Sequence, residues 1–247
     1  MERTILLVFL FTAVEGDIGK HVYIQNKTRW TEAQAYCREH HTDLSYLNSQ
    51  SELVKLRKAA GGQQVGGWIG LQRDPNNKTA WKWSGGGHIT YQNWHDGQPN
   101  GDGGNGVVEN NGAISWNGKW FDVKETKSFH FYCVDVSVEE EKMSWEDALS
   151  HCRQKQTDLP SLLSETDRLL AQTEIQNNNI SERVWIGLRF LGDRWMWVNG
   201  DPLEYEAWSK QGGQDHQCPI SKRCGALTKD RLWENWDCQD KLNFICI

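Results

Sequence analysis

The sequence contains the same pattern of residues twice, so the fold must be built from two similar halves. A tryptophan seven residues before a cysteine, a WIGL tetrapeptide, two further tryptophans and a last cysteine follow in the same order in both copies. The matched positions are Trp30 and Trp145, Cys37 and Cys152, 68–71 and 185–188, Trp94 and Trp208, Trp120 and Trp233, and Cys133 and Cys246. Their offset drifts only between 113 and 117 residues, which indicates small insertions in loops between fixed core positions. The chain is therefore a tandem duplication.

Each copy is expected to run from two helices into short strands. In copy one, residues 31–41 have apolar residues at helical period, with Thr31 and Gln34 in capping-box spacing. A second helix is expected within residues 49–62, where two glycines end it. Ser144 and Ser164 are the expected helix caps of copy two. After each WIGL segment, aromatic-rich pieces alternate with Gly, Asn and Asp, which predicts strands joined by long loops.

The amino terminus and the charge of the chain favour an extracellular binding protein. Residues 1–16 have a charged start, a short apolar run and small residues near Gly16, the layout of a signal peptide. No later stretch approaches the roughly 20 apolar residues of a membrane helix. A net charge of −6 disfavours nucleic-acid binding. No catalytic motif of the G-x-S-x-G or H-E-x-x-H type is present, so we expect no enzyme. A truncated receptor ectodomain is the alternative to a secreted chain.

The cysteines and sequons suit the same compartment. Seven cysteines in an exported chain imply disulfides plus at least one thiol left over. Sequons for N-glycosylation occur at Asn26, Asn77 and Asn179. No Pro-, Gly- or Ser-rich linker separates the copies, so their boundary is expected within residues 135–138.

Several of these motifs together resemble the C-type lectin-like domain, present twice, and most closely the tandem domains of mannose-receptor-like proteins. The markers are W-x6-C, WIGL, the tripeptide QPN at residues 98–100, and aromatic strands that end in cysteine, FHFYC and NFICI. The resemblance implies an α+β fold in which two helices pack on small antiparallel sheets and a long irregular loop forms the binding surface. The expected domains are 17–135 and 136–247, after the signal peptide.

The resemblance also implies a disulfide framework. It assigns Cys37–Cys133 and Cys152–Cys246 to the bridges that join the ends of each domain, and Cys224–Cys238 to the bridge that staples the long loop of domain 2. In domain 1 the two positions of the loop bridge are expected at Gly106 and Glu125. Cys218 is left over, as a free thiol, an intermolecular bridge or a competitor of Cys224 for Cys238. A metal set of His216, Cys218 and Cys224 is disfavoured because a disulfide claims Cys224.

Family members hold calcium and a sugar in the long loop, and copy one matches part of that pattern. Gln98, Pro99 and Asn100 fill the loop tripeptide, in which the proline is typically cis, and Asp122 fills a later ligand position. Phe121 stands where the family has Asn. The downstream Glu position falls on Gly104 and Asn105, with Asp96 and Asp102 as substitutes. With one carboxylate at a family position, any calcium binding is expected to be weak, toward the millimolar range. Copy two has Gly212, Gly213 and Gln214 instead of the tripeptide, which disfavours calcium there.

Two functions follow from these residues. The leading hypothesis is a secreted lectin that binds glycans or glycoproteins through the domain 1 loop, weakly and with calcium as its cofactor, using Gln98, Asn100, Asp122 and Trp94. The alternative is a calcium-independent protein-binding or adhesion module with degenerate sugar sites. Trp116 is a second candidate for ligand contact. The repeated tryptophans are expected to pack in the core: Trp30, Trp68, Trp120, Trp145, Trp185 and Trp233.

Overall fold

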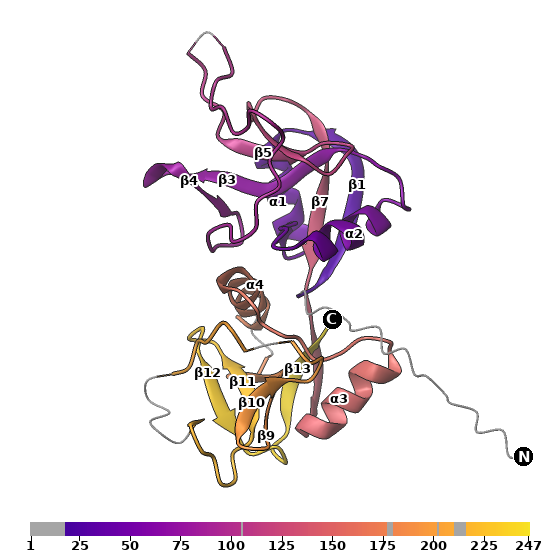
Figure 1. Cartoon of the computed structure of the whole chain (residues 1–247). Coiled ribbons are helices and arrows are strands. Elements are labelled where there is room, and N and C mark those ends of the chain that lie inside the picture. The colour runs from indigo at the N-terminus through magenta and orange to yellow at the C-terminus, as the bar shows by residue number, and fades with distance from the viewer. Residues whose placement is uncertain (1–17, 105, 177–179, 202, 210–215) are drawn as a thin grey trace, which may run out of the picture.

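The computed structural model describes residues 18–104, 106–176, 180–201, 203–209 and 216–247. These residues form two α+β halves stacked end to end, which we call domain 1 (β1 to β7) and domain 2 (β8 to β13) (Figure 1). The signal-peptide prediction for residues 1–16 lies outside the described residues. The duplication seen in the sequence is therefore a duplication of one fold.

Domain 1 is a seven-stranded sheet with a helix on each side. Its strands run in the order β1-β7-β3-β5-β6, while β2 pairs with β7 and β4 with β3. All ladders are antiparallel except the contact of β3 with β7. The elements are β1 (Lys20–Thr28), α1 (Trp30–His40), β2 (Asp43–Leu44), α2 (Gln50–Ala59), β3 (Gly67–Asp74), β4 (Asn77–Trp83), β5 (Asn111–Ile114), β6 (Trp120–Val123) and β7 (Phe129–Asp135).

Domain 2 repeats this plan with six strands in the order β12-β11-β9-β13-β8 and β10 on β9. The parallel pairing of β13 with β9 matches that of β7 with β3 in domain 1. The elements are β8 (Ser137–Met143), α3 (Trp145–Gln154), α4 (Glu165–Ile175), β9 (Arg183–Leu191), β10 (Arg194–Trp197), β11 (Cys224–Thr228), β12 (Trp233–Trp236) and β13 (Leu242–Cys246).

Serine side chains start three of the four described helices. The Ser144 and Ser164 hydroxyls accept the N–H groups of Asp147 and Asp167, which confirms both predicted caps, and Ser49 caps α2 in the same way. The capping box predicted from Thr31 is wrong. Helix α1 already starts at Trp30, and the Glu32 carboxylate accepts the backbone N–H of Arg29, which is the N-cap residue. Thr31 therefore lies inside the first turn, where its side chain cannot cap the helix.

The six repeated tryptophans form the frame of both cores, as predicted, and each is at most 3% exposed. The indole N–H of Trp30 donates to Ile69 O at 2.9 Å, and that of Trp145 donates to Ile186 O at the same distance. Both carbonyls belong to the WIGL strands. Each of these two large rings is thus buried without leaving its polar group unpaired.

Three disulfides close the two domains: Cys37–Cys133, Cys152–Cys246 and Cys224–Cys238. These are the pairs that the resemblance implies. The first two span 96 and 94 residues, and the chain-entropy model gives each on the order of 4–5 kcal/mol. Cys218 is exposed and is the free cysteine among the described residues, so it does not compete for Cys238.

Strand register corrects one position of the lost loop bridge. In domain 2, Cys224 pairs with Arg189 on β9 and Trp236 on β12. In domain 1, Asn111 pairs with the matching residues Gln72 and Val123. Asn111 is therefore the equivalent of Cys224, and the prediction of Gly106 was wrong because more residues precede β5 than the sequence count assumed. Glu125 keeps its predicted place as the equivalent of Cys238.

The two domains meet at a single residue and along one helix. Strand β7 ends at Asp135 and β8 begins at Ser137, so only Val136 lies between them. The first residue of β1, Lys20, pairs with Asp135, and the last residue of β13, Cys246, pairs with Ser137. Both ends of the described chain thus lie beside the junction (Figure 1).

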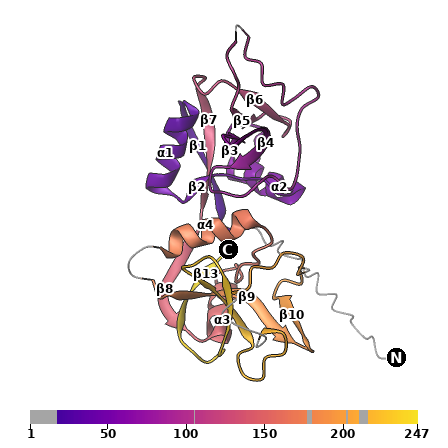
Figure 2. The same cartoon turned by 90° about the vertical axis from the view of Figure 1, so that its left-hand side faces the viewer.

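Helix α4 of domain 2 lies against the underside of domain 1 (Figure 2). The Thr166 hydroxyl donates to Gly86 O at 3.0 Å, and the Asn48 amide donates to Ser164 Oγ at 3.1 Å. Gly86 has a φ of +104°, which favours glycine, and a β-carbon there would stand 2.4 Å from Leu169 Cδ1, so the turn approaches the helix closely.

Candidate functional site

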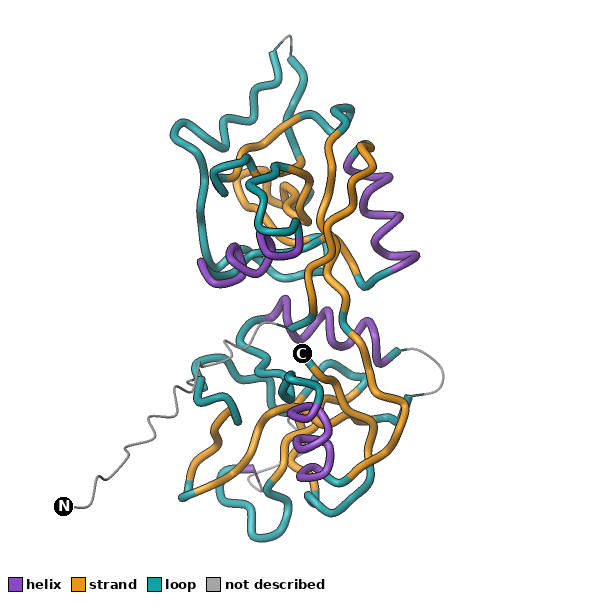
Figure 3. Tube along the Cα trace, turned by 90° about the vertical axis from the view of Figure 1, so that its right-hand side faces the viewer, coloured by secondary structure: helices purple, strands orange, loops and turns teal. Residues whose placement is uncertain are grey.

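The long loop of domain 1 joins β4 to β5 and projects from the end of the molecule remote from domain 2 (Figure 3). Its first part is tied to β6, because Trp120 N–H donates to Asn93 O and His95 N–H donates to Trp120 O, both at 2.8 Å. The Gln98–Pro99 peptide bond is cis, as the resemblance implies. Gln98 and Asn100 therefore flank a sharp reversal that lies over β6.

Asp122 on β6 is the centre of the hydrogen bonds that hold this reversal. Its carboxylate accepts the N–H of Asn100 at 3.0 Å and the N–H of Gly101 at 2.7 Å. Its own N–H donates to the Gln98 side-chain oxygen at 3.3 Å. The structure thus brings together three of the residues selected from the sequence. The Asp122 side chain has no exposed surface.

A protein cation already lies on the Asp122 carboxylate. Arg73 Nη2 on β3 stands 3.2 Å from Asp122 Oδ2, and the Arg73 side chain is only 15% exposed. Its Nη1 donates to the carbonyl of Lys78 at 2.7 Å, and Nη2 also donates to the carbonyl of Glu109 at 3.1 Å. The same group lies 4.6 Å from the ring centre of Trp81. Arg73 is therefore fixed on all sides, and the sequence analysis did not select it.

The residues of this loop do not fit a calcium ion. Calcium takes six to eight oxygen ligands at about 2.3–2.6 Å. Here Gln98 and Asp122 oxygens accept protein N–H groups, and Asn100 Oδ1 accepts the N–H of Asp102 at 2.8 Å. A divalent ion at Asp122 would also be repelled by the adjacent Arg73 guanidinium. Among the residues that the structure describes, no three His, Cys, Asp or Glu side chains gather as a metal site.

Glu109 is the second acid of the loop, and the sequence analysis missed it. It lies two residues before β5, whereas counting from the tripeptide put the downstream acid at Gly104 and Asn105. Partial burial, followed by the neighbouring Asp122 carboxylate, raises the pKa of the Glu109 carboxyl. The pairing of β5 with β3 and β6 is what places Glu109, and the sequence does not show that pairing. Of the proposed substitutes, Asp102 accepts the N–H of Gly104 at 2.7 Å and so shapes the loop itself.

The two candidate tryptophans differ in their surroundings. Trp94 is partly buried, and its ring packs against Trp81 at 4.9 Å and Trp120 at 5.7 Å, which favours a packing role over sugar contact. Trp116 is 66% exposed in the turn between β5 and β6. Phe121 packs edge-on against Phe129 and points away from Asp122, since neighbouring strand residues face opposite sides.

In domain 2 the matching groups are engaged by protein partners. Glu234, which follows Trp233, is paired with Arg183 at 2.6 Å. The amide of Asn235, the counterpart of Asp122, donates to Lys222 O at 3.2 Å. The loop residues Gly212, Gly213 and Gln214 lie outside the described residues.

The predicted modification sites lie on the surface where they are described. Asn26 on β1 and Asn77 on β4 are exposed, and Asn179 lies outside the described residues. No helix within the described part of the chain is long and apolar enough to span a bilayer.

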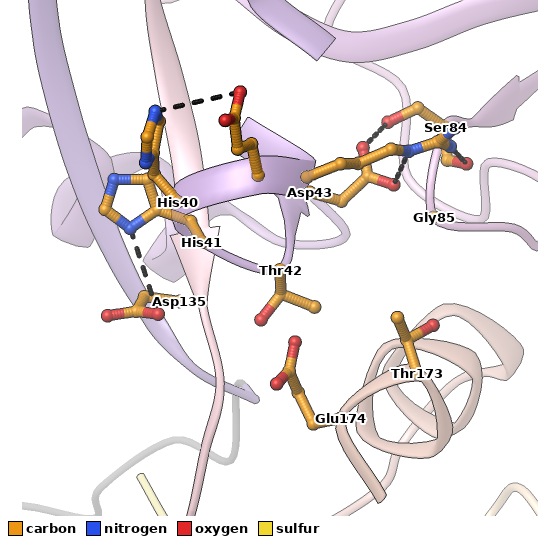
Figure 4. Close-up of a pocket in the computed structure, with 11 residues that line it drawn as sticks. His40, His41, Thr42, Asp43, Ser84, Gly85, Asp135, Thr173 and Glu174 are labelled. Atoms are coloured by element: carbon orange, nitrogen blue, oxygen red, sulfur yellow. Dashed lines mark hydrogen bonds and ion pairs between the residues drawn. The ribbon is translucent and has the colours of Figure 1, made fainter. Parts of the chain in front are cut away.

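A pocket of about 620 Å³ lies between the two domains near their junction, and residues of both domains line it (Figure 4). The Thr42 and Glu174 side chains face each other across it, and His41 lies 3.8 Å from Asp135. Burial raises the pKa of the Glu174 carboxyl, an effect that the donating Thr42 hydroxyl opposes. Thr42 also accepts the N–H of Val136, so one hydroxyl links both domains to the residue between them.

Comparison with known proteins identifies the family. The model of the lectin C-type domain matches residues 26–135 and again residues 141–247. The chain therefore belongs to the C-type lectin domain family, with two copies of the domain.

Curated relatives include two proteins much longer than this chain and one that is shorter. The chain is 23% identical to human lymphocyte antigen 75 and 22% identical to rat C-type mannose receptor 2, in each case over 90% of its own length. It spans only 15% and 17% of the length of those two relatives. The snaclec VP12 of Daboia palaestinae is 33% identical and matches 48% of this chain and 89% of its own length.

Similar solved structures each cover about half of this chain. The carbohydrate-recognition domain of the mouse scavenger receptor C-type lectin is 28% identical, with a TM-score of 0.42, over 46% of this chain and 86% of that one. The family assignment rests on the domain match.

Proposed function

We propose that the chain is an extracellular binding protein that recognises glycans or glycoproteins through domain 1 without calcium. The observation that carries this proposal is the Arg73–Asp122 pair. Family members use a bound calcium ion to hold the loop tripeptide, and here the guanidinium supplies the positive charge while Asp122 holds the loop backbone. The proposal keeps the glycan ligand of the leading hypothesis and drops its metal.

The extracellular location is part of the proposal. The signal-peptide pattern of residues 1–16 and the three disulfides both suit an oxidising compartment. The exposed sequons at Asn26 and Asn77 suit it as well. Receptors among the relatives carry this domain, and the name of one of them, C-type mannose receptor 2, points to a sugar ligand.

Thermal unfolding with and without calcium tests the metal independence. At about 10 mM calcium, roughly ten times the weakest dissociation constant typical of extracellular sites, a calcium site would add about 1.4 kcal/mol. We expect no shift in Tm, and equal binding to an oligosaccharide array in calcium and in EDTA. A Tm shift that EDTA reverses would show that a metal, and not Arg73, completes the loop.

A protein ligand is the second candidate function, and one observation favours it. Val107 and Val108 in the long loop are 45% and 57% exposed, which is unusual beside so polar a segment. Binding to deglycosylated as well as native glycoproteins, with no signal on the oligosaccharide array, would support this alternative over the glycan.

A further inference from the structure

Domain 1 contains an open cleft at the place where domain 2 carries its loop disulfide. Asn111 and Glu125, the equivalents of Cys224 and Cys238, both line this cleft, whose volume is about 650 Å³. Its other walls come from the start of α1, the end of β3, the β3–β4 turn and the base of the long loop. The lost bridge has therefore left a space of the size in which proteins bind small molecules.

The cleft has polar side chains without a protein partner. Asn111 is only 6% exposed, yet its amide makes no hydrogen bond or ion pair with any part of the chain that the structure describes. Gln72 and Asn110 line the same cleft and their side chains are likewise without a partner among the described residues. Of the three residues, Asn111 is buried, Gln72 is half-buried and Asn110 is exposed. These amides are available to a polar ligand in a way that those around Asp122 are not.

The charges of the cleft balance. Arg73 and Lys78 are opposed by Asp74 and Glu125, and the Arg73 group is already committed to Asp122. A strongly charged ligand would therefore gain little. An amide both donates and accepts hydrogen bonds, as a sugar hydroxyl does, so the three amides that line the cleft are suited to hydroxyl groups. Val108, which is 57% exposed, offers apolar surface for the face of a sugar ring.

Domain 2 differs at the corresponding place. Cys224 and Cys238 are joined there, and Arg189, the counterpart of Gln72, is paired with Glu146 at 2.6 Å and lies over the ring of Trp145 at 4.8 Å. The open cleft with its unpartnered amides is thus a property of domain 1.

We infer that the cleft between β3, the long loop and β5 is the glycan-binding site of domain 1, and that it takes a short neutral oligosaccharide. This inference rests on the proposed function and places the ligand beside the family's calcium position instead of on it. Asn110 and Asn111 contact the sugar, while Arg73 and Asp122 position the loop that forms one wall.

The test begins with the full chain in EDTA on a printed array of neutral oligosaccharides, and the strongest hit is then titrated by calorimetry. Asn110→Ala with Asn111→Ala is expected to weaken binding at least tenfold. The double variant Asn111→Cys with Glu125→Cys, which rebuilds the bridge of domain 2, is expected to abolish it, whereas Asn111→Ser with Glu125→Ser leaves the cleft open and is expected to retain part of it. Asn76→Ala, in the β3–β4 turn next to the cleft but not lining it, is the matched control.

A second measurement does not depend on variants. Titration of the hit into ¹⁵N-labelled protein is expected to shift the side-chain amide signals of Asn110 and Asn111. An array hit that all cleft variants bind as tightly as the wild type, with those signals unmoved, overturns the cleft assignment and leaves the proposed function standing. An array with no hit overturns both.

Discussion

Replacing Arg73 by alanine is expected to destabilise domain 1 by about 4 kcal/mol. The substitution leaves the Asp122 carboxylate buried without its cation, and breaking a buried pair in this way typically costs about 3–5 kcal/mol. The cation–π contact with Trp81 adds about 0.5–1 kcal/mol. The N–H groups of Asn100 and Gly101 remain on the carboxylate and keep the loss toward the middle of that range. Against a typical total stability of about 5–15 kcal/mol, the loss is large.

Urea unfolding followed by tryptophan fluorescence measures this loss, and hydrogen–deuterium exchange of β5 and β6 assigns it to domain 1. Arg194→Ala, at an exposed arginine on β10, is the control and is expected to change stability by less than about 0.5 kcal/mol. The double variant Arg73→Met with Asp122→Asn removes both charges and is expected to lose less than the sum of its single variants. A loss below about 1 kcal/mol for Arg73→Ala would refute the role of Arg73 as the cation of the loop.

Three further predictions concern pH and the domain contact. Burial, with some repulsion from Lys55, lowers the pKa of His21 to about 4. As the pH falls, the unfolded chain therefore takes up a proton first, and the free energy of unfolding drops by about 3 kcal/mol between pH 6.5 and 4. The urea midpoint of His21→Gln should lack this contribution to the pH dependence. Gly86→Ala is expected to loosen the contact of α4 with domain 1 and to increase exchange in α4, because the backbone there has a φ of +104° and the added carbon meets Leu169. Gly200→Ala, at a φ of +88° in open space, should not. Glu174→Gln is expected to raise Tm at neutral pH, because burial of the charged Glu174 carboxylate destabilises the folded wild type. The gain in Tm should vanish below about pH 4.5, where the carboxyl is protonated in both the folded and the unfolded chain. An equal gain at both pH values would exclude this cause.

The repeated residues predict the frame of the fold well, because they serve the same local purpose in both copies. Each framework tryptophan recurs because it occupies the same buried position in the core of each domain. The serines before α3 and α4 cap their helices by a rule that needs only nearby residues. The prediction of the α1 cap failed because Thr28, Thr31 and Glu32 all fit the residue preferences of a helix start. Only the first residue of the helix decides which of them can cap it.

The chemistry of the loop was less predictable because it depends on residues that are distant along the chain. Arg73 is 25 residues before Gln98 and follows the WIGL segment, and its counterpart in copy two is Phe190, so the repeat gives no sign of its role. The positions of the downstream acid and of the loop cysteine were assigned to the wrong residues instead of Glu109 and Asn111. They were counted forward from the tripeptide, and the number of residues in a loop varies between domains. Pairing of β5 with β3 and β6 fixes both positions, and that register is a tertiary fact.

The junction at Val136 lies beside both the first strand and the last strand of the described chain. Lys20 and Cys246 pair with the residues on either side of it, so β1 begins and β13 ends at the junction between the two domains. The long loop of domain 1 lies at the far pole (Figure 1). Immobilising the protein through a segment attached after β13 should therefore leave the long loop facing outward.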